Sequence, residues 1–160
     1  MIVVLTGVSG SGKSTVGSTL AQQLSWPFHE GDDHHPPENV RKMRAGIPLD
    51  DADRGPWLDS LRALIDELYA QGRDAVIAAS LLKKAHRARL ARPGVRFVFL
   101  KADPSLLRER LAKRKGHFFD PALLDSQLDA LEQPEDALVV DAGPSPQAIA
   151  ATIRAAVLAD

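Results

Sequence analysis

Short apolar runs alternate with longer segments of mixed polarity along the 160-residue chain. The apolar runs have the length of strands and lie at 2–8, near Phe28, at 75–79, at 95–100 and at 137–140. Because they are apolar at consecutive positions, they predict strands buried on both faces of a parallel sheet. Their alternation with helix-length segments predicts right-handed βαβ crossovers and therefore an α/β fold.

Several helix starts are marked by a capping residue followed by proline at the first helical position, where the missing N–H is not needed. These pairs are Asp103-Pro104, Asp120-Pro121 and Ser145-Pro146. Further helices are predicted over Lys13–Leu24 and behind Asp53, where apolar residues line one face until Gly72 ends the pattern. Polar residues and prolines dominate 29–53, so apolar periodicity defines the elements there less well. From Arg41 the chain has the pattern of a short basic helix, a turn and an acidic approach to the next helix.

The segment between the first predicted strand and the first predicted helix matches the phosphate-binding pattern G-x-x-x-x-G-K-[ST]. It consists of Gly7, Val8, Ser9, Gly10, Ser11, Gly12, Lys13 and Ser14, followed by Thr15. Glycines let the backbone approach phosphate oxygens, and the helix N-terminus supplies positive potential. We expect Lys13 to bridge the β- and γ-phosphates and Ser14 to ligate Mg²⁺. A glycine-rich turn with a chance lysine is the alternative, which the strand-loop-helix context disfavours.

Polar side chains follow the short second strand. Ligands of open parallel sheets bind beyond the carboxyl ends of the strands, so Asp32 should lie near the phosphate loop. A carboxylate there can accept a proton from a substrate hydroxyl or hold Mg²⁺ through water. The pair His34-His35 raises the alternative of a structural metal site, but the chain has no cysteine and no third ligand at a convincing spacing.

Arg54 lies among three acidic residues just before a predicted helix. Asp50, Asp51 and Asp53 suit a helix N-terminus and could serve only as caps. Arg54 could form a surface ion pair with them, or its guanidinium fork could bind an anionic substrate. The local sequence favours neither interpretation.

Three stretches carry a resemblance to a known family. Gly31–Pro36 fits the pattern G-D-x-x-H-P, Lys42–Leu58 fits K-M-x-x-G-x-P-L-x-D-x-D-R-x-P-W-L, and Arg114–Phe119 reads R-K-G-H-F-F. Together with Leu131–Pro134 they resemble the gluconate kinase (gluconokinase) family of P-loop small-molecule kinases. The motifs occur in the family's order, and the resemblance extends over nearly the whole chain. The resemblance implies transfer of the γ-phosphoryl group of ATP to the 6-hydroxyl of D-gluconate.

The same resemblance implies the architecture and the site. It implies one three-layer, nucleoside-monophosphate-kinase-like domain over 1–160, with about five parallel strands, a substrate segment at roughly 31–58 and a mobile lid at roughly 113–121. The implied catalytic residues are Lys13, Asp32 and Arg114. Arg110 is expected against the adenine, and Ser14 and Asp32 at the Mg²⁺. The expected substrate contacts are Asp32, His35, Arg54, Ser80 and Lys83.

One stretch departs from the family pattern. After the third strand the family has C-S-A-L-K-x-x-Y-R, and here Ser80, Lys83 and Arg87 agree with it. Leu81 stands in place of the small alanine and His86 in place of the tyrosine. Both could alter the substrate pocket. Two alternatives therefore stay open for the acceptor: another sugar acid, or a shikimate-like compound. A nucleotide-sensing protein without phosphotransfer is a further alternative.

Charge and composition restrict the partners. The net charge is −1, yet residues 83–117 hold 12 of the 20 basic residues and 2 of the 21 acidic ones. We interpret this concentration as the surface that meets a nucleotide triphosphate, with a solvated helix face as the alternative. Interleaved aromatics are absent, so a nucleic-acid partner is not expected. The N-terminal apolar run is too short to span a membrane, which predicts a cytoplasmic protein without membrane contact. The resemblance also implies a possible homodimer.

Overall fold

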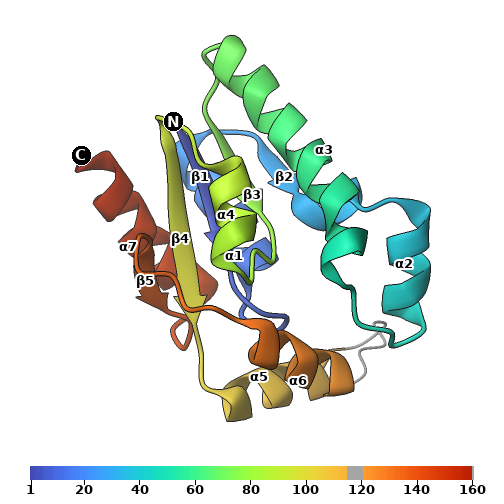
Figure 1. Cartoon of the computed structure of the whole chain (residues 1–160). Helices are drawn as coiled ribbons and strands as arrows, with labels where there is room; N and C mark the ends of the chain where they lie inside the picture. The colour runs from blue at the N-terminus through green and yellow to red at the C-terminus, as the bar shows by residue number, and fades with distance from the viewer. Residues whose placement is uncertain (115–120, 160) are drawn as a thin grey trace.

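The computed structural model describes residues 1–114 and 121–159. In this part of the chain, parallel strands form one five-stranded sheet in the order β2-β3-β1-β4-β5 (Figure 1). The strands are β1 (Ile2–Thr6), β2 (Phe28–Glu30), β3 (Ala75–Ala78), β4 (Val95–Lys101) and β5 (Leu138–Asp141). The predicted parallel α/β fold is confirmed, with small shifts at the strand ends.

Helices cover both faces of the sheet and its carboxyl edge (Figure 1). They are α1 (Lys13–Leu24), the 3₁₀ helix η1 (Gly31–His34), α2 (Pro37–Arg44), α3 (Asp51–Ala70), α4 (Lys84–Leu90), α5 (Pro104–Ala112), α6 (Pro121–Ala130) and α7 (Pro146–Leu158). The strands divide their side chains between two cores. Val3 and Leu5 of β1 pack with α1 and α7, whereas Ile2 and Val4 pack with α3 and α4. Burial on both faces explains the unbroken apolar runs.

A third apolar cluster lies at the carboxyl end of the sheet, where the chain leaves β4 and enters α5 (Figure 1). Val8 of the phosphate loop and Leu82 pack there against Leu107 of α5 and Leu124 of α6. This cluster fixes α5 and α6 beside the phosphate loop. It therefore places residues from the second half of the chain next to the glycine-rich segment at its beginning.

The segment 29–53 is regular despite its polar, proline-rich composition, and the predicted short basic helix is α2. It forms the end of β2, then η1, then α2, and its path depends on Gly31. A Cβ at Gly31 would lie 2.4 Å from the carbonyl oxygen of Ala78, so only glycine lets η1 lie against the end of β3. The indole N–H of Trp57 donates a hydrogen bond to the Gly31 carbonyl at 2.8 Å, which ties η1 to α3.

The helix caps agree in part with the sequence signals. Ser145 caps α7 by accepting the N–H of Ala148 at 3.2 Å, whereas Asp103 occupies the cap position of α5 without a capping hydrogen bond. Gly72 adopts a positive φ of 62° directly after α3, as expected for a helix stop. Asp120 lies outside the described residues.

Most of the expected lid, 113–121, also lies outside the described residues, including Lys115–Phe119 of the R-K-G-H-F-F stretch. Among the helices that are described, none has both the length and the apolar character needed to cross a bilayer.

Candidate active site

The phosphate loop connects β1 to α1 with Gly10 and Gly12 in left-handed conformations, at φ values of 87° and 92°. Gly12 caps α1, and Lys13 is the first residue of that helix. The Lys13 side chain is buried, and burial lowers its pKa, while the carboxylates of Asp32 and Glu30 partly oppose this effect. A buried cation at a helix N-terminus gives the loop the positive potential that a phosphate group requires.

A cavity of about 420 Å³ opens beside the phosphate loop. Its walls come from the loop, from η1 and α2, from the first turns of α3, from the segment after β3 and from α6. The lining residues are Ser9, Asp32, His35, Val40, Met43, Arg44, Ile47, Pro48, Leu49, Arg54, Trp57, Ser80, Leu82, Arg114, Leu123, Ser126 and Gln127. The fold thus brings together four residues expected at the acceptor, which are Asp32, His35, Arg54 and Ser80. Arg114, expected at the phosphates, lies with them.

His35 is fixed in orientation on the wall of this acceptor cavity. Its ring stacks on Trp57 with centroids 4.5 Å apart, and the Asn39 side-chain amide donates to its Nδ1 at 3.1 Å. The proton of the neutral ring is therefore on Nε2, which lies 3.8 Å from a carboxylate oxygen of Asp32. Burial lowers the pKa of His35, so the ring offers the cavity a neutral N–H donor.

Arg54 lies one turn into α3, partly buried on the wall of the acceptor cavity. Its acidic neighbours form caps and ion pairs of their own. Asp50 and Asp53 form a reciprocal capping box, in which the Asp53 N–H donates to Asp50 at 2.7 Å and the Asp50 N–H to Asp53 at 3.0 Å. Asp53 also accepts a 2.8 Å ion pair from Lys42. The surroundings therefore favour the interpretation of Arg54 as a group facing the cavity.

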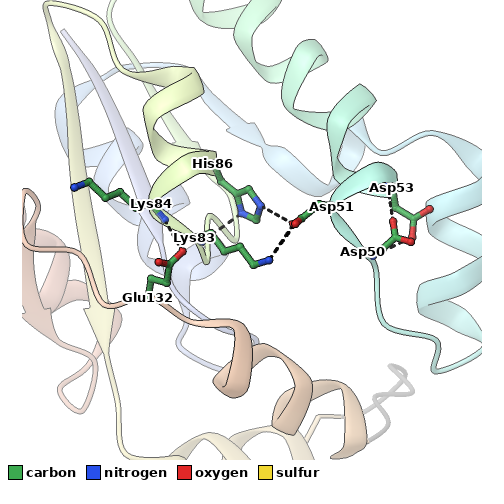
Figure 2. A network of polar contacts seen from close by, with 7 residues as sticks. All are labelled: Asp50, Asp51, Asp53, Lys83, Lys84, His86 and Glu132. Atoms are coloured by element: carbon green, nitrogen blue, oxygen red, sulfur yellow. Dashed lines mark hydrogen bonds and ion pairs between the residues drawn. The ribbon is translucent and has the colours of Figure 1, made fainter.

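Lys83 is placed differently from the expectation. It is not among the residues that line the acceptor cavity, and its ammonium lies 3.1 Å from Asp51 at the start of α3 (Figure 2). His86 approaches the same carboxylate, with Nε2 at 3.5 Å. Leu81 is buried, and its N–H donates to Thr6 Oγ1 at 2.9 Å.

A second, smaller cavity of about 270 Å³ also adjoins the phosphate loop. It is lined by Gly10, Ser11, Gly12, Thr15, Val16, Arg110, Arg114, Pro144, Pro146 and Ile149. The Arg110 guanidinium donates to the carbonyls of Gly10 at 3.4 Å, Ser11 at 3.3 Å and Ala142. Arg110 thus joins the phosphate loop to the turn after β5. Arg114 lines both cavities.

The comparisons with known proteins agree with this geometry. A family model described as an AAA domain matches residues 2–134. A gluconokinase from Gluconobacter oxydans is 46% identical over 136 residues, which cover 84% of this chain and 76% of that protein. The chain belongs to the gluconokinase family. A crystal structure of a gluconokinase from Sinorhizobium meliloti superposes with a TM-score of 0.87 at 42% identity, covering 98% of this chain and 91% of that one.

A more distant likeness concerns the fold alone. Shikimate kinase from Aquifex aeolicus superposes with a TM-score of 0.65 but is 20% identical. The gluconokinase relatives match at more than twice that identity, so the shikimate-like alternative is not favoured.

Sequence reasoning did not find two side chains of the acceptor cavity that can contribute to the chemistry. Gln127 of α6 accepts the backbone N–H of Ser9 at 2.8 Å and donates to Ser9 Oγ at 3.1 Å. Arg44 adds a second cation to the acceptor side of the cavity. Gln127 lies outside the family motifs quoted above, and Arg44 falls at a variable position of one of them. No local spacing pointed to either residue.

The basic stretch 83–117 meets the two cavities at fewer residues than the interpretation of it as a nucleotide-binding surface expected. Most of its cations in the described residues serve contacts away from the two cavities. Arg87 donates to the carbonyls of Leu81 and Glu132, while ion pairs engage Arg89 with Asp59, Arg92 with Asp66, Arg108 with Asp125 and Lys113 with Glu109. Only Arg110 and Arg114 among the described basic residues of 83–117 line a cavity. The charge of this stretch is chiefly structural.

Proposed function

We propose that this protein transfers the γ-phosphoryl group of ATP to the 6-hydroxyl of D-gluconate, forming 6-phospho-D-gluconate and ADP. The observation that carries the proposal is one cavity that joins the phosphate loop to Asp32 and to Arg54. A polyol acid needs such a site, with hydrogen-bonding groups for its hydroxyls and a cation for its carboxylate. The identity with gluconokinases over most of the chain selects D-gluconate among such acids.

Asp32 is the proposed general base. Its exposed carboxylate lines the acceptor cavity. The same carboxylate interacts electrostatically with Lys13 of the phosphate loop, so Asp32 lies between the acceptor and the phosphates. Asp32 orients the 6-hydroxyl and takes its proton as that oxygen bonds to the γ-phosphorus and ADP leaves. His35 supplies a hydrogen bond to the acceptor, and so does Ser80. Arg54 binds the carboxylate of the sugar acid through its guanidinium fork.

The nucleotide is held by the phosphate loop, whose residues 7–15 wrap its phosphates. Lys13 bridges the β- and γ-phosphates, and Arg114 neutralises charge on the transferred group from its position between the two cavities. Arg110 borders the adenine. Because ordered donors surround the γ-phosphoryl group, the protein contributes chiefly positioning and charge neutralisation.

The residues present fit a magnesium ion that is shared with the nucleotide. No group of three or more described His, Asp and Glu side chains could hold a metal by itself. Mg²⁺ in kinases keeps waters and phosphate oxygens and needs one or two protein oxygens, for which the Ser14 hydroxyl and the Asp32 carboxylate are available. When bound, Mg²⁺ neutralises charge on the β- and γ-phosphates.

A coupled assay of ADP release tests the proposal. We expect ADP formation that requires ATP and D-gluconate and is weaker by at least about tenfold in kcat/KM with other sugar acids and with shikimate. D-Glucose, which lacks the carboxylate, is the matched neutral control. Release of ADP at the same rate without an added acid, or a higher kcat/KM with a different acceptor, contradicts the proposal.

Two further expectations accompany this function. A cytoplasmic location is expected, and fractionation of the source cells tests it. A homodimer is expected from the family resemblance, and light scattering coupled to size-exclusion chromatography measures it directly.

A further inference from the structure

Within residues 1–114 and 121–159, the Arg54 guanidinium forms no ion pair, although three carboxylates are close to it in the sequence. Asp50, Asp51 and Asp53 all interact with it electrostatically, and the attraction of Asp51 is the largest. Yet no ion pair joins Arg54 to any of them in the described part of the chain. A partly buried arginine would normally take a neighbouring carboxylate as its partner, because burial of an unpaired charge is costly.

Each carboxylate is held by another group. Asp50 caps the N-terminus of α3, and Asp53 is bound by the ammonium of Lys42 at 2.8 Å. Asp51 is bound by Lys83, whose Nζ lies 3.1 Å and 3.2 Å from the two carboxylate oxygens, and it also faces His86 (Figure 2).

Asp51 is the carboxylate best placed to reach Arg54. The two residues are three apart in α3, a spacing at which side chains on a helix meet and form ion pairs. Asp51 is exposed and therefore has room to change rotamer. Its carboxylate would then compete with any anion that enters the cavity.

The groups that hold Asp51 come from the segment after β3, which also lines the acceptor cavity. Ser80 and Leu82 face the cavity, while Lys83 and His86 turn towards α3. The buried His86 ring accepts the backbone N–H of Lys83 at Nδ1, at 3.3 Å, so the proton on Nε2 is directed at Asp51. The ring thereby fixes both the start of α4 and the carboxylate.

We propose that Lys83 is a positioning residue that sequesters the Asp51 carboxylate, with His86 as a second donor, and so leaves Arg54 free to bind the carboxylate of the acceptor. This inference deepens the proposed function and rests on it. It also gives Lys83 a role that requires no contact with the substrate.

Steady-state kinetics of single and double variants test the sequestration. In Lys83→Met, the released Asp51 competes for Arg54, and KM for D-gluconate should rise about fivefold while KM for ATP changes by less than about twofold. Asp51→Asn in the same chain removes the competitor, so the double variant Lys83→Met/Asp51→Asn should return to within about twofold of the wild-type KM.

The matched control is Arg89→Met, which breaks an ion pair from α4 to Asp59 of α3, away from the cavity. Its KM values should equal those of the wild type. A double variant as impaired as Lys83→Met overturns the proposal and points to direct contact between Lys83 and substrate. An unchanged KM in Lys83→Met overturns it as well.

A crystal structure of Lys83→Met gives a result that does not depend on the substrate. The proposal expects an Asp51 carboxylate oxygen within about 4 Å of the Arg54 guanidinium. Asp51 remaining away from Arg54 refutes the sequestration, whatever the acceptor is. Failure of the proposed function is seen separately, as a wild-type enzyme that releases no ADP in response to D-gluconate.

Discussion

The side-chain amide of Gln127 forms two hydrogen bonds with Ser9, a residue 118 positions earlier in the chain. The amide oxygen accepts the Ser9 N–H and the amide nitrogen donates to the Ser9 hydroxyl. Both residues line the acceptor cavity, and Ser9 belongs to the phosphate loop. This contact joins α6, which follows the expected lid in the sequence, to the loop that binds the phosphates.

Replacement of Gln127 by leucine should therefore impair the handling of ATP. Loss of both hydrogen bonds leaves the Ser9 N–H without its partner, at a cost of about 1 kcal/mol. We expect kcat/KM for ATP to fall about fivefold, as measured by initial rates at saturating D-gluconate. Asp129→Ala, an exposed change on the same helix, serves as the control. If the two variants behave alike, the contact does not support the phosphate loop.

Asp32→Asn removes the proposed base and retains its shape. Because an amide cannot accept the proton of the attacking hydroxyl, kcat should fall by about 10² or more. ATP affinity, measured by calorimetry, should stay within about twofold. Asp33→Asn changes the adjacent exposed carboxylate, which does not line the acceptor cavity, and should leave kcat unaltered. Normal turnover in Asp32→Asn removes the residue from the mechanism.

Arg54→Ala should raise KM for D-gluconate by about tenfold or more, because a charge-assisted contact contributes about 1.5–3 kcal/mol. KM for ATP should change far less. Arg44→Ala is the informative comparison, since Arg44 is the other cation on the acceptor side of the cavity. A larger effect of Arg44→Ala would assign the substrate carboxylate to Arg44. Equal effects of Arg54→Ala on both substrates would indicate a role in folding.

Gly31→Ala should destabilise the fold. Its Cβ would lie 2.4 Å from the Ala78 carbonyl oxygen and 2.9 Å from the Ala79 Cβ, so η1 must move away from β3. We expect a loss of about 1–3 kcal/mol in the free energy of unfolding, measured by urea denaturation. Gly55→Ala is the matched control: no atom lies within 4 Å of its added Cβ, and alanine should raise stability slightly within α3. Equal stability of the two variants contradicts the packing argument.

Acidification below about pH 6.5 should lower stability through three histidines. Burial lowers the pKa of His29, His35 and His86 below the ordinary value of 6.5. The unfolded chain then takes up protons at a higher pH than the folded chain, so stability falls as the pH drops below 6.5 and is unaffected above it. Thermal unfolding between about pH 5 and 8 measures this slope.

The substitution His86→Gln tests the origin of that slope, since it removes one of the three titrating groups. Its melting temperature should depend less on pH in this window than that of the wild type. The ion-paired carboxylates do not explain a change of stability between about pH 5 and 8. The pKa values of Asp51 and Asp53 are lowered from 3.8, so these groups take up protons only at more acidic pH. An identical slope in the variant argues against His86 as a contributor.

The sequence by itself determined the elements and the chemistry of the phosphate site. A strand buried on both faces has a continuous apolar run in the sequence, and the phosphate loop is contiguous in the chain. Gly72 and Ser145 end and begin helices through contacts with residues next to them in sequence. Family motifs also pointed to several residues that line the acceptor cavity, among them Asp32, Arg54 and Ser80. These features are local, or are copied from relatives, and so they are visible without coordinates.

The tertiary structure alone decided which side chains meet. The contact between Gln127 and Ser9 depends on the apolar packing of α5 and α6 at the carboxyl end of the sheet. No short-range sequence pattern predicts this packing. The same holds for the partner of Lys83: the family resemblance implied a role at the substrate, and the fold places its ammonium against Asp51. Hydrogen bonds and ion pairs form only between groups that are close in space, and these residues become neighbours only in the folded protein.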